Sequence, residues 1–370
     1  MSSPQDFDVI VIGAGIAGAS VAYFVAPHGR VALVEREAQP GYHSTGRSAA
    51  VFAPSYGPPQ VRALTRASRG HLQALPGVLT PRGSLFPARA SQLDALHHLY
   101  ERLRAEGGRG VALLDTRAAQ ARVPVLRRQA AVAALHDDDA SDIDVHALHQ
   151  HYLRSAKAQQ ATLVCDFDVT GLAFSQSRWE VRNAQRTLRA PVVVNAAGAW
   201  ADEVGALAGA RPLGLQPKRR SAFTFAAPDG VDARHWPAVV GIDEDFYFTP
   251  QGGVLLGSPA NADPVAPHDV VAEEFDIATG ISRIEAATTM TIRRPLRTWA
   301  GLRSFVPDGE LVGGFDDALP GFFWCCGQGG YGIQTSAAMG AACAARILGE
   351  PLPAYISDQG LTFEDLRCRR

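Results

Sequence analysis

Apolar residues cluster at the start of the chain in an order typical of a strand, a turn and a helix. The apolar run in residues 8–13 predicts a buried strand, and small and apolar residues from Ile16 to about Pro27 predict a helix. Residues 30–35 repeat the apolar run and predict a second strand. Because these elements follow one another so closely, they indicate a βαβ unit, and we expect a doubly wound α/β sheet.

The same order of strand, small-residue turn and helix recurs further along the chain. Residues 190–195 predict a strand that leads through a turn into a helix at 201–208. Residues 321–325 predict a last strand, and an alanine-rich helix is expected from about Gly332 to Leu348. We expect these segments to join the N-terminal unit in one discontiguous domain.

The middle of the chain has a different pattern. Asp144 is a suitable N-cap for a helix that runs to about Ala158, and residues 161–181 predict short antiparallel strands. Apolar and polar positions alternate in residues 221–258, which predicts more antiparallel sheet. We therefore expect two domains: an α/β domain formed by residues 1–80, 140–208 and 297–370, and an inserted α+β domain formed by residues 81–139 and 209–296.

The glycines of the first turn are spaced as in a dinucleotide-binding site. Gly13 allows a tight turn, Gly15 leaves room for a pyrophosphate beside the backbone, and Gly18 lets the helix pack on the strand. Glu35 ends the second strand, where its carboxylate can accept hydrogen bonds from a ribose. This arrangement predicts a dinucleotide site, but NAD and FAD share the pattern, so the glycines alone do not distinguish them.

Composition and charge narrow the class of protein. The 370 residues are 46% hydrophobic with a net charge of −2, so the chain can bury a large core and lacks the cationic field that nucleic acid binding requires. Five cysteines without CxxC spacing favour a reduced, cytoplasmic setting. The uncharged stretch in residues 9–26 contains three glycines and follows two aspartates, so we interpret it as strand, turn and helix and expect no transmembrane segment.

Several segments resemble one enzyme family over nearly the full length of the chain. They include the N-terminal glycine motif, residues 43–50 (HSTGRSAA), residues 193–200 (VVNAAGAW) and residues 329–336 (GGYGIQTS). On these segments the chain resembles the D-amino-acid oxidase family of FAD-dependent oxidoreductases. Within that family it resembles the bacterial D-arginine dehydrogenases, on residues 42–50, 212–223, 255–264, 291–295, 299–305 and 328–340. The resemblance implies an α/β fold in which an FAD-binding Rossmann-like domain of the glutathione-reductase type carries an inserted antiparallel-sheet substrate domain.

The resemblance also implies how the cofactor is bound. FAD would be held without a covalent bond, and a helix start near residues 330–335 would face the flavin pyrimidine ring and stabilise the charge of reduced flavin. A covalent link to Cys325 or Cys326 is the less favoured alternative. The cofactor-binding residues expected from the family and the glycine turn are Gly13, Ala14, Gly15, Ile16, Ala17, Gly18, Glu35, Arg36, Ser44, Thr45, Arg47, Ser48, Ala49, Ala50, Val169, Ala196, Ala197, Gly198, Trp200, Gly330, Tyr331, Gly332, Ile333, Gln334 and Thr335.

The substrate site implied by the resemblance is built around a carboxylate. Arg220 and Arg303 would bind the α-carboxylate, and Tyr247 would donate its hydroxyl to it. Bidentate arginine contacts fix both the position and the orientation of a carboxylate, which hydride transfer from the α-carbon requires. Strand alternation places Tyr247 on the face opposite its two phenylalanine neighbours. Further residues expected at the site are Tyr56 over the substrate, and Gly301, Gly330 and Gln334.

One departure from the family concerns the substrate side chain. Where D-arginine dehydrogenases carry an acid that pairs with the guanidinium, this sequence has Ser84, and their loop histidine and threonine correspond to Val51 and Ala53. An unpaired buried guanidinium costs on the order of several kcal/mol. We therefore expect a D-amino-acid dehydrogenase with a broad or apolar side-chain preference, which produces imino acids that hydrolyse to 2-oxo acids and ammonia.

Other interpretations remain open. The substrate can instead be another small carboxylate, such as a secondary amino acid, an opine or a 2-hydroxy acid, or the chain can be a flavin subunit that needs a partner chain. A quinone, oxygen or another compound can serve as electron acceptor. His136, residues 137–139, His146, His149 and His151 form the densest cluster of histidines and acids, but they complete no ligand pattern, and we expect no metal. We expect a cytoplasmic protein, either free or peripheral to the inner membrane.

Overall fold

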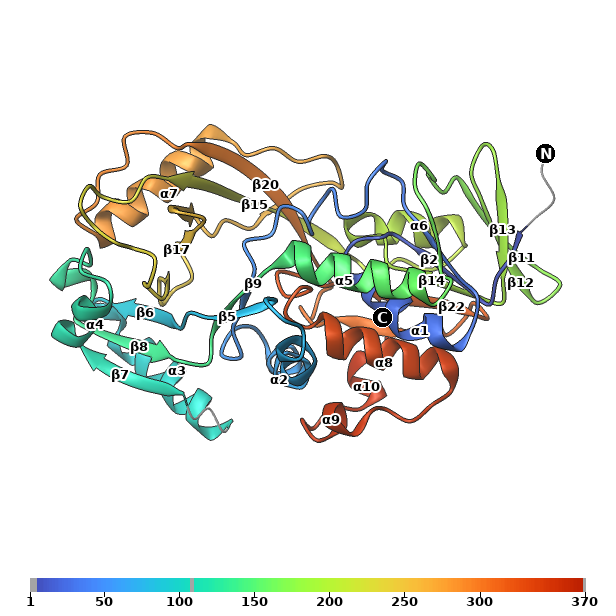
Figure 1. The fold of residues 1–370 in the computed structure, drawn as a ribbon, viewed down its shortest axis with the longest axis horizontal. Helices are drawn as coiled ribbons and strands as arrows, with labels where there is room; N and C mark the ends of the chain where they lie inside the picture. The colour runs from blue at the N-terminus through green and yellow to red at the C-terminus, as the bar shows by residue number, and fades with distance from the viewer. Residues whose placement is uncertain (1–4, 107–109, 369–370) are drawn as a thin grey trace.

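The computed structural model describes residues 5–106 and 110–368, and a six-stranded sheet lies at the centre of one lobe (Figure 1). Neighbouring strands are parallel except for the last pair. Strands β2 and β3 are buried along their whole length, because both faces of the sheet are covered. The strand order is β10 (Thr162–Val164), β3 (Val31–Val34), β2 (Val9–Ile12), β14 (Val192–Asn195), β22 (Phe322–Cys326) and β21 (Val312–Phe315).

Helices cover one face of this sheet, and a second sheet covers the other. Helices α1 (Ile16–Val25), α5 (Val145–Ala158) and α8 (Ser336–Leu348) pack together on the first face. On the second face, Trp179 and Leu188 share a buried core with Ile10. The elements on that side are β1 (Gln5–Asp6), β13 (Thr187–Ala190), β12 (Arg178–Arg182), β11 (Gly171–Ser175) and α6 (Ala201–Leu207).

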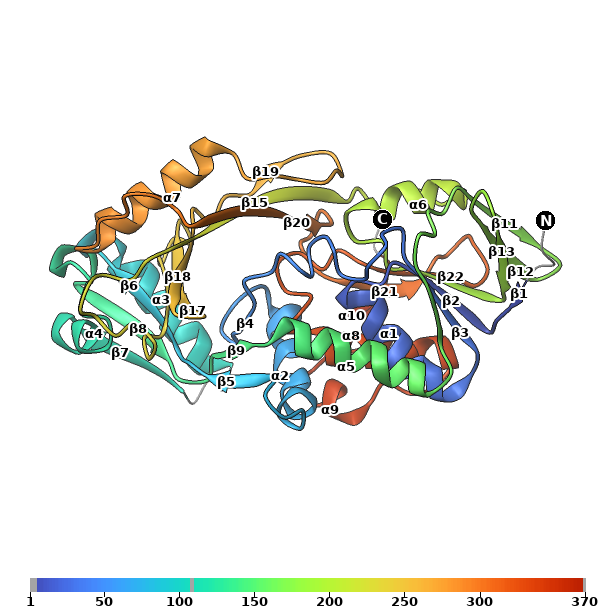
Figure 2. The same ribbon diagram turned by 45° about the horizontal axis from the view of Figure 1, so that its top comes forward.

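A nine-stranded sheet forms the other lobe, with two long strands that reach back toward the first lobe (Figure 2). Helices α4 (Thr116–Arg122) and α7 (Glu274–Ala287) pack on one face, and α3 (Leu93–Ala105) packs beside Phe86 on the other. The strand order is β19 (Asp263–Pro264), β15 (Gln216–Phe225), β18 (Val254–Ser258), β17 (Tyr247–Gln251), β16 (Ala238–Val240), β6 (Ser84–Ala88), β8 (Ala133–Asp137) and β7 (Val111–Asp115), and β20 (Arg297–Phe305) also pairs with β15.

Shorter elements connect the lobes and complete the helical layer. Strands β4 (Val51–Phe52), β9 (Ser141–Ile143) and β5 (Leu79–Pro81) form a small sheet between the lobes. Helix α2 (Pro59–Gln73) packs against α8, with α9 (Ala354–Ser357) and α10 (Phe363–Leu366) beside them. None of the helices in the described part of the chain combines the length and the apolar character needed to cross a bilayer.

The structure confirms the α/β fold and corrects two predicted elements. Residues 162–164 pair in parallel with β3 and extend the central sheet, whereas the sequence predicted an antiparallel strand there. Helix α8 begins at Ser336 rather than near Gly332, because the preceding residues form turns. The boundary expected at residue 297 places residues 297–305 in the first domain. These residues form β20, which pairs with β15 in the nine-stranded sheet of the other lobe.

Candidate functional site

Two adjoining cavities run from the glycine turn to the nine-stranded sheet. The nucleotide cavity lies beside the turn between β2 and α1, and the arginine cavity lies where β15 and β20 approach the first lobe. The nucleotide cavity has an empty volume of about 1070 Å³ and the arginine cavity one of about 1420 Å³, each including its opening to solvent. The cavities adjoin, because both are lined by Ile16, Ser44, Thr45, Leu302, Gln328 and Gly329.

The glycine turn has no room for larger residues at two of its three positions. Gly13 has a φ of +99°, and a Cβ there would lie 2.5 Å from the carbonyl oxygen of Ala196. A Cβ on Gly18 would lie 1.8 Å from the carbonyl oxygen of Gly13. The sheet and the helix can therefore approach this closely only with glycine at both positions, which supports the interpretation from sequence.

Side chains hold the turn beside the nucleotide cavity. The Glu35 carboxylate accepts a hydrogen bond from the Ala14 N–H at 2.9 Å, and the Thr45 hydroxyl accepts one from the Ile16 N–H at 3.0 Å. The Arg36 guanidinium carbon lies 4.2 Å from the centre of the Trp200 ring, and both residues line the nucleotide cavity. An acidic strand end, a helix N-terminus and a flat stacking surface suit a ribose, a diphosphate and an adenine, respectively.

The expected cofactor residues divide between the two cavities, which together match an elongated dinucleotide. The nucleotide cavity is lined by Gly13, Gly15, Ile16, Ala17, Glu35, Arg36, Ser44, Thr45, Val169, Ala196, Ala197, Gly198 and Trp200. The arginine cavity is lined by Ser44, Thr45, Arg47, Ser48, Ala49, Ala50, Gly330, Gly332, Ile333 and Gln334. Ala14, Gly18, Tyr331 and Thr335 support these walls without lining either cavity.

The Arg47 guanidinium binds groups of the protein itself. Its guanidinium forms an ion pair with Asp269 and donates hydrogen bonds to the carbonyl oxygens of Val270, at 2.9 Å, and Ala300. The Trp299 indole in turn donates to the Arg47 carbonyl oxygen at 3.0 Å. Arg47 therefore ties the segment of residues 43–50 to β20 and to the loop before α7.

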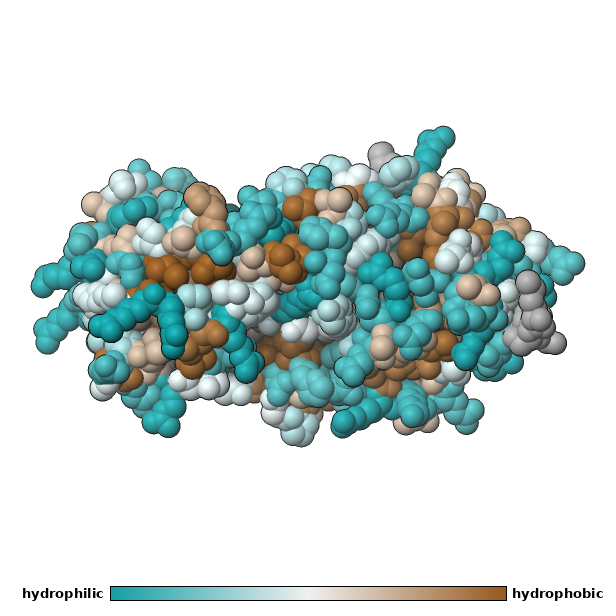
Figure 3. Space-filling view, turned by 90° about the horizontal axis from the view of Figure 1, so that it is seen from above, coloured by the Kyte–Doolittle hydropathy of each residue, from teal (hydrophilic) through white to brown (hydrophobic). Residues whose placement is uncertain are grey.

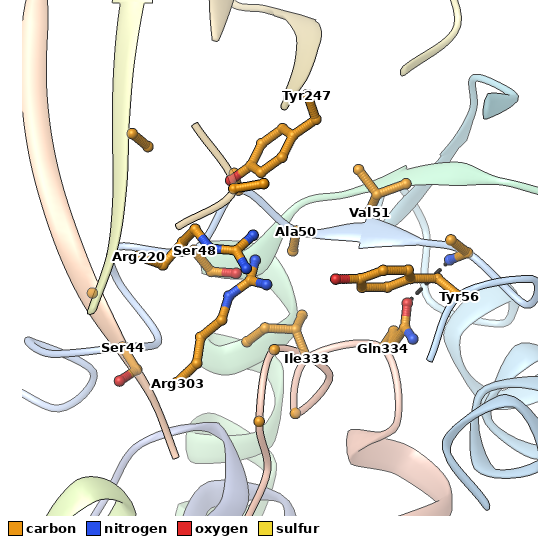
Figure 4. A pocket seen from close by; sticks show the side chains of 18 of the residues that line it. Ser44, Ser48, Ala50, Val51, Tyr56, Arg220, Tyr247, Arg303, Ile333 and Gln334 are labelled. Carbon is orange, nitrogen blue, oxygen red and sulfur yellow. Dashed lines mark hydrogen bonds between the residues drawn. The ribbon is translucent and has the colours of Figure 1, made fainter. Parts of the chain in front are cut away.

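Strand pairing brings the two expected carboxylate ligands together. Residues 220 and 301 are partners in the β15–β20 pair, as are residues 218 and 303, so Arg220 and Arg303 lie diagonally on one face. Figure 4 shows their guanidinium groups side by side in the arginine cavity. Arg219 points to the opposite face, where it forms ion pairs with Asp263, Glu273 and Asp276.

The surroundings of the two guanidinium groups favour an anionic ligand. Burial lowers the pKa of Arg220, and the charge of Arg303 lowers it further. Within the described ranges 5–106 and 110–368, neither arginine forms an ion pair with an acidic side chain. Arg220 donates through Nε to the Asn261 carbonyl oxygen at 2.6 Å, which fixes the side chain. Two fixed, adjacent cations in a cavity wall suit a planar carboxylate.

Two tyrosines face the guanidinium pair, and a glutamine lies further along the same cavity wall. Tyr247 and Tyr56 line the cavity, and their hydroxyls point toward Arg220 and Arg303 from two sides (Figure 4). The Tyr56 ring packs edge-on against Tyr331, with ring centres 5.3 Å apart. The Gln334 side-chain oxygen accepts a hydrogen bond from the Ala53 N–H at 3.1 Å, while its buried Nε2 has no partner among the described residues. These groups can orient a substrate between the arginines and the segment of residues 330–334.

The wall beyond the arginines is mostly apolar. Ser84 lies on β6 with only 2% of its surface exposed, and Val51, Ala53, Phe86 and Val240 line the cavity with it. Glu244, in the turn before β17, also lines the cavity and was not singled out from the sequence. Glu244 and Ser84 are 160 residues apart in the sequence. The pairing of β16 with both β6 and β17 brings them to the same cavity.

The cysteines and histidines considered from the sequence as flavin or metal ligands do not line the two cavities. Cys325 and Cys326 are buried and line neither cavity. His149 donates through Nε2 to the Ala14 carbonyl oxygen at 2.8 Å, so it supports the glycine turn from α5. His136 lies on β8 beside Asp138. In the part of the chain that the structure describes, no three His, Cys, Asp or Glu side chains gather as a metal site.

Known proteins resemble this chain over most of its length. The family described as "DAO: FAD dependent oxidoreductase" matches residues 8–346. The FAD-dependent oxidoreductase domain-containing protein 1 of Bos taurus is 24% identical over 404 residues, which cover 93% of this chain and 82% of the bovine protein. Glycine oxidase from Geobacillus kaustophilus has the same fold, with a TM-score of 0.85 and 21% identity over 99% of both chains. L-proline dehydrogenase from P. horikoshii has a TM-score of 0.81 and 21% identity over 97% of this chain and 99% of its own.

Proposed function

Because the chain belongs to the DAO family of FAD-dependent oxidoreductases and has FAD as its cofactor, we propose that it catalyses the oxidative deamination of D-amino acids. The observation that carries the proposal is the pair of guanidinium groups in the arginine cavity, next to the nucleotide cavity, with no ion pair to an acidic side chain in the described chain. The D configuration is supported by the resemblance of residues 42–50, 212–223 and 328–340 to D-arginine dehydrogenases. Glycine oxidase and L-proline dehydrogenase are named for small amino acids, in keeping with a carboxylate site of this size.

The residues of the chain bind and orient the substrate, and FAD, held without a covalent bond, supplies the acceptor for the hydride from the α-carbon. Arg220 and Arg303 bind the α-carboxylate, and Tyr247 donates its hydroxyl to the same group. Tyr56 covers the substrate and excludes water, and the amide of Gln334 and the backbone at Gly330 and Gly301 border the amine. The amine reacts in its neutral form, and the imino acid product is hydrolysed to a 2-oxo acid and ammonia.

The wall beyond the carboxylate site supports a broad preference among uncharged side chains. Val51, Phe86 and Val240 offer apolar contact, and the Ser84 hydroxyl carries no charge to pair with a guanidinium. We therefore expect D-leucine and D-methionine to be better substrates than D-arginine, as measured by kcat/KM. Burying the guanidinium of D-arginine without a counter-charge costs several kcal/mol, and about 1.4 kcal/mol corresponds to a factor of ten.

A substrate panel with an artificial electron acceptor tests the proposal. The FAD-loaded protein is assayed for kcat/KM with D- and L-leucine, D-methionine, D-arginine, glycine, proline, an opine and a 2-hydroxy acid, and ammonia release is measured in parallel. We expect D-leucine or D-methionine to give the highest kcat/KM, with one ammonia for each two-electron reduction of acceptor. A panel in which a secondary amine or a hydroxy acid leads would overturn the proposal. Full FAD loading without activity on any compound would favour a subunit that needs a partner chain.

A further inference from the structure

A row of polar side chains crosses the nine-stranded sheet at the far end of the arginine cavity. In the register of β17, β16, β6 and β8, Thr249 lies opposite Ala238, Ala238 opposite Ser84, and Ser84 opposite Asp137. Residues that are partners across strands point to the same face, and here that is the face on which Thr249, Ala238 and Ser84 line the cavity. The next row toward the arginines contains Tyr247, Val240 and Phe86.

The two hydroxyls of this row are buried without protein partners. Ser84 is 2% exposed and Thr249 is 8% exposed, and neither Oγ of Ser84 nor Oγ1 of Thr249 has a hydrogen-bond partner within the described ranges 5–106 and 110–368. Leaving a buried polar group without a hydrogen-bond partner is unfavourable. Ala238, between them, has the smallest side chain in the row, so it leaves space for a group that could contact both hydroxyls.

We propose that the Ser84 and Thr249 hydroxyls form a subsite for an uncharged hydrogen-bonding group at the end of the substrate side chain, such as a carboxamide or a hydroxyl. This inference rests on the proposed function. Each hydroxyl can donate one hydrogen bond and accept others, so the pair matches a carboxamide, which has both an NH₂ and an oxygen. An apolar side chain of the same size would leave both hydroxyls unpaired, which lowers its kcat/KM relative to the polar analogue.

The charges around the row argue against a cationic side chain. The only carboxylate of the row is that of Asp137. It is 2% exposed and does not line the cavity, so it is not positioned to contact a bound cation. Its Oδ1 accepts a hydrogen bond from the Asp139 N–H at 2.9 Å. Glu244, the one acidic residue in the described lining, lies in an exposed turn outside the row. A cation at the subsite would thus be buried against two neutral hydroxyls, which is unfavourable.

The test compares substrates that have the same shape but differ in polarity. For the FAD-loaded wild type and the variants Ser84→Ala, Thr249→Val and the double variant, kcat/KM is measured with D-asparagine and D-leucine, and with D-glutamine and D-methionine. D-arginine is measured with the wild type as well. The inference predicts that the polar-to-apolar ratio falls at least tenfold in the double variant, and that Thr249→Ser, which keeps the hydroxyl, restores most of the ratio lost in Thr249→Val. Thr187→Val on β13, away from both cavities, is the matched control and should leave the ratio unchanged.

Different outcomes separate this inference from the proposed function. An unchanged ratio in an active, FAD-loaded double variant would overturn the subsite alone, as would a wild type that prefers D-arginine to both members of each pair. A wild type that oxidises none of the D-amino acids would overturn the proposed function and the subsite with it. If the double variant does not fold, the ratio in Thr249→Val decides the question, because valine has nearly the same shape as threonine.

Discussion

The carboxylate site depends on single side chains whose removal has a specific kinetic signature. Replacing Arg303 with methionine should raise KM for D-leucine roughly a hundredfold, because a lost charged hydrogen-bonding partner costs about 2–5 kcal/mol. FAD should remain bound, since Arg303 does not line the nucleotide cavity. Arg219→Met is a matched control on the opposite face of the same sheet and should leave KM unchanged. Loss of flavin from the Arg303 variant would instead indicate a structural role.

The backbone at Gly330 touches the same guanidinium. A Cβ at this position would lie 2.7 Å from Nη1 of Arg303, so Gly330→Ala must displace the end of that side chain. We expect KM to rise at least tenfold, with the melting temperature nearly unchanged because a flexible side chain can move aside. Gly70→Ala, in α2 with no atom within 4 Å of the added Cβ, is the control and should not alter KM. Equal KM values in both variants would contradict the proposed position of Arg303.

At the scale of elements, the sequence was most informative where a pattern is local. The sequence predicted β2, β14 and the α5 helix with its Asp144 cap. Apolar runs and helix caps depend on neighbouring residues, so they can be recognised without the fold. The Arg47–Asp269 ion pair and the polar row through Ser84 and Thr249 could not be predicted. They depend on the register of strands that are far apart in the sequence, which only the folded sheet defines.

Four buried or half-buried histidines give a pH dependence of stability. Burial lowers the pKa of His71 in α2, of His136 in β8, and of His149 and His151 in α5, and His151 lowers that of His71 further. Below about pH 6.5 the unfolded chain therefore binds protons that the folded chain does not, and the free energy of unfolding should fall between pH 7 and pH 5. Denaturant unfolding at both values checks this.

A variant isolates the histidine contribution from that of the carboxyl groups. Burial raises the pKa of Asp137 and Asp142, which acts in the opposite direction as the pH falls. The double variant His71→Gln, His151→Gln should therefore lose less stability than the wild type between pH 7 and pH 5. An identical loss in both proteins would show that these two imidazoles do not contribute.

At the scale of the whole molecule, the two lobes meet at the two adjoining cavities. The six-stranded sheet supplies the cofactor side, the nine-stranded sheet supplies the substrate side, and residues 43–50 are tied to both. The face seen in Figure 3 is mostly hydrophilic, with several hydrophobic patches. The 35 basic and 37 acidic residues of the whole chain leave it with a net charge of −2. The positive charge that matters for the proposed function is thus inside the molecule, on Arg220 and Arg303.

Anaerobic mixing of the FAD-loaded protein with the two enantiomers of leucine tests the central claim most directly. D-leucine should bleach the flavin absorbance in a single turnover and yield one 2-oxo acid and one ammonia. Deuterium at its α-carbon should slow the bleaching several-fold, because the C–H bond breaks in that step. L-leucine should leave the flavin oxidised. Bleaching by L-leucine, or an oxidised flavin with every D-amino acid tried, would contradict the account.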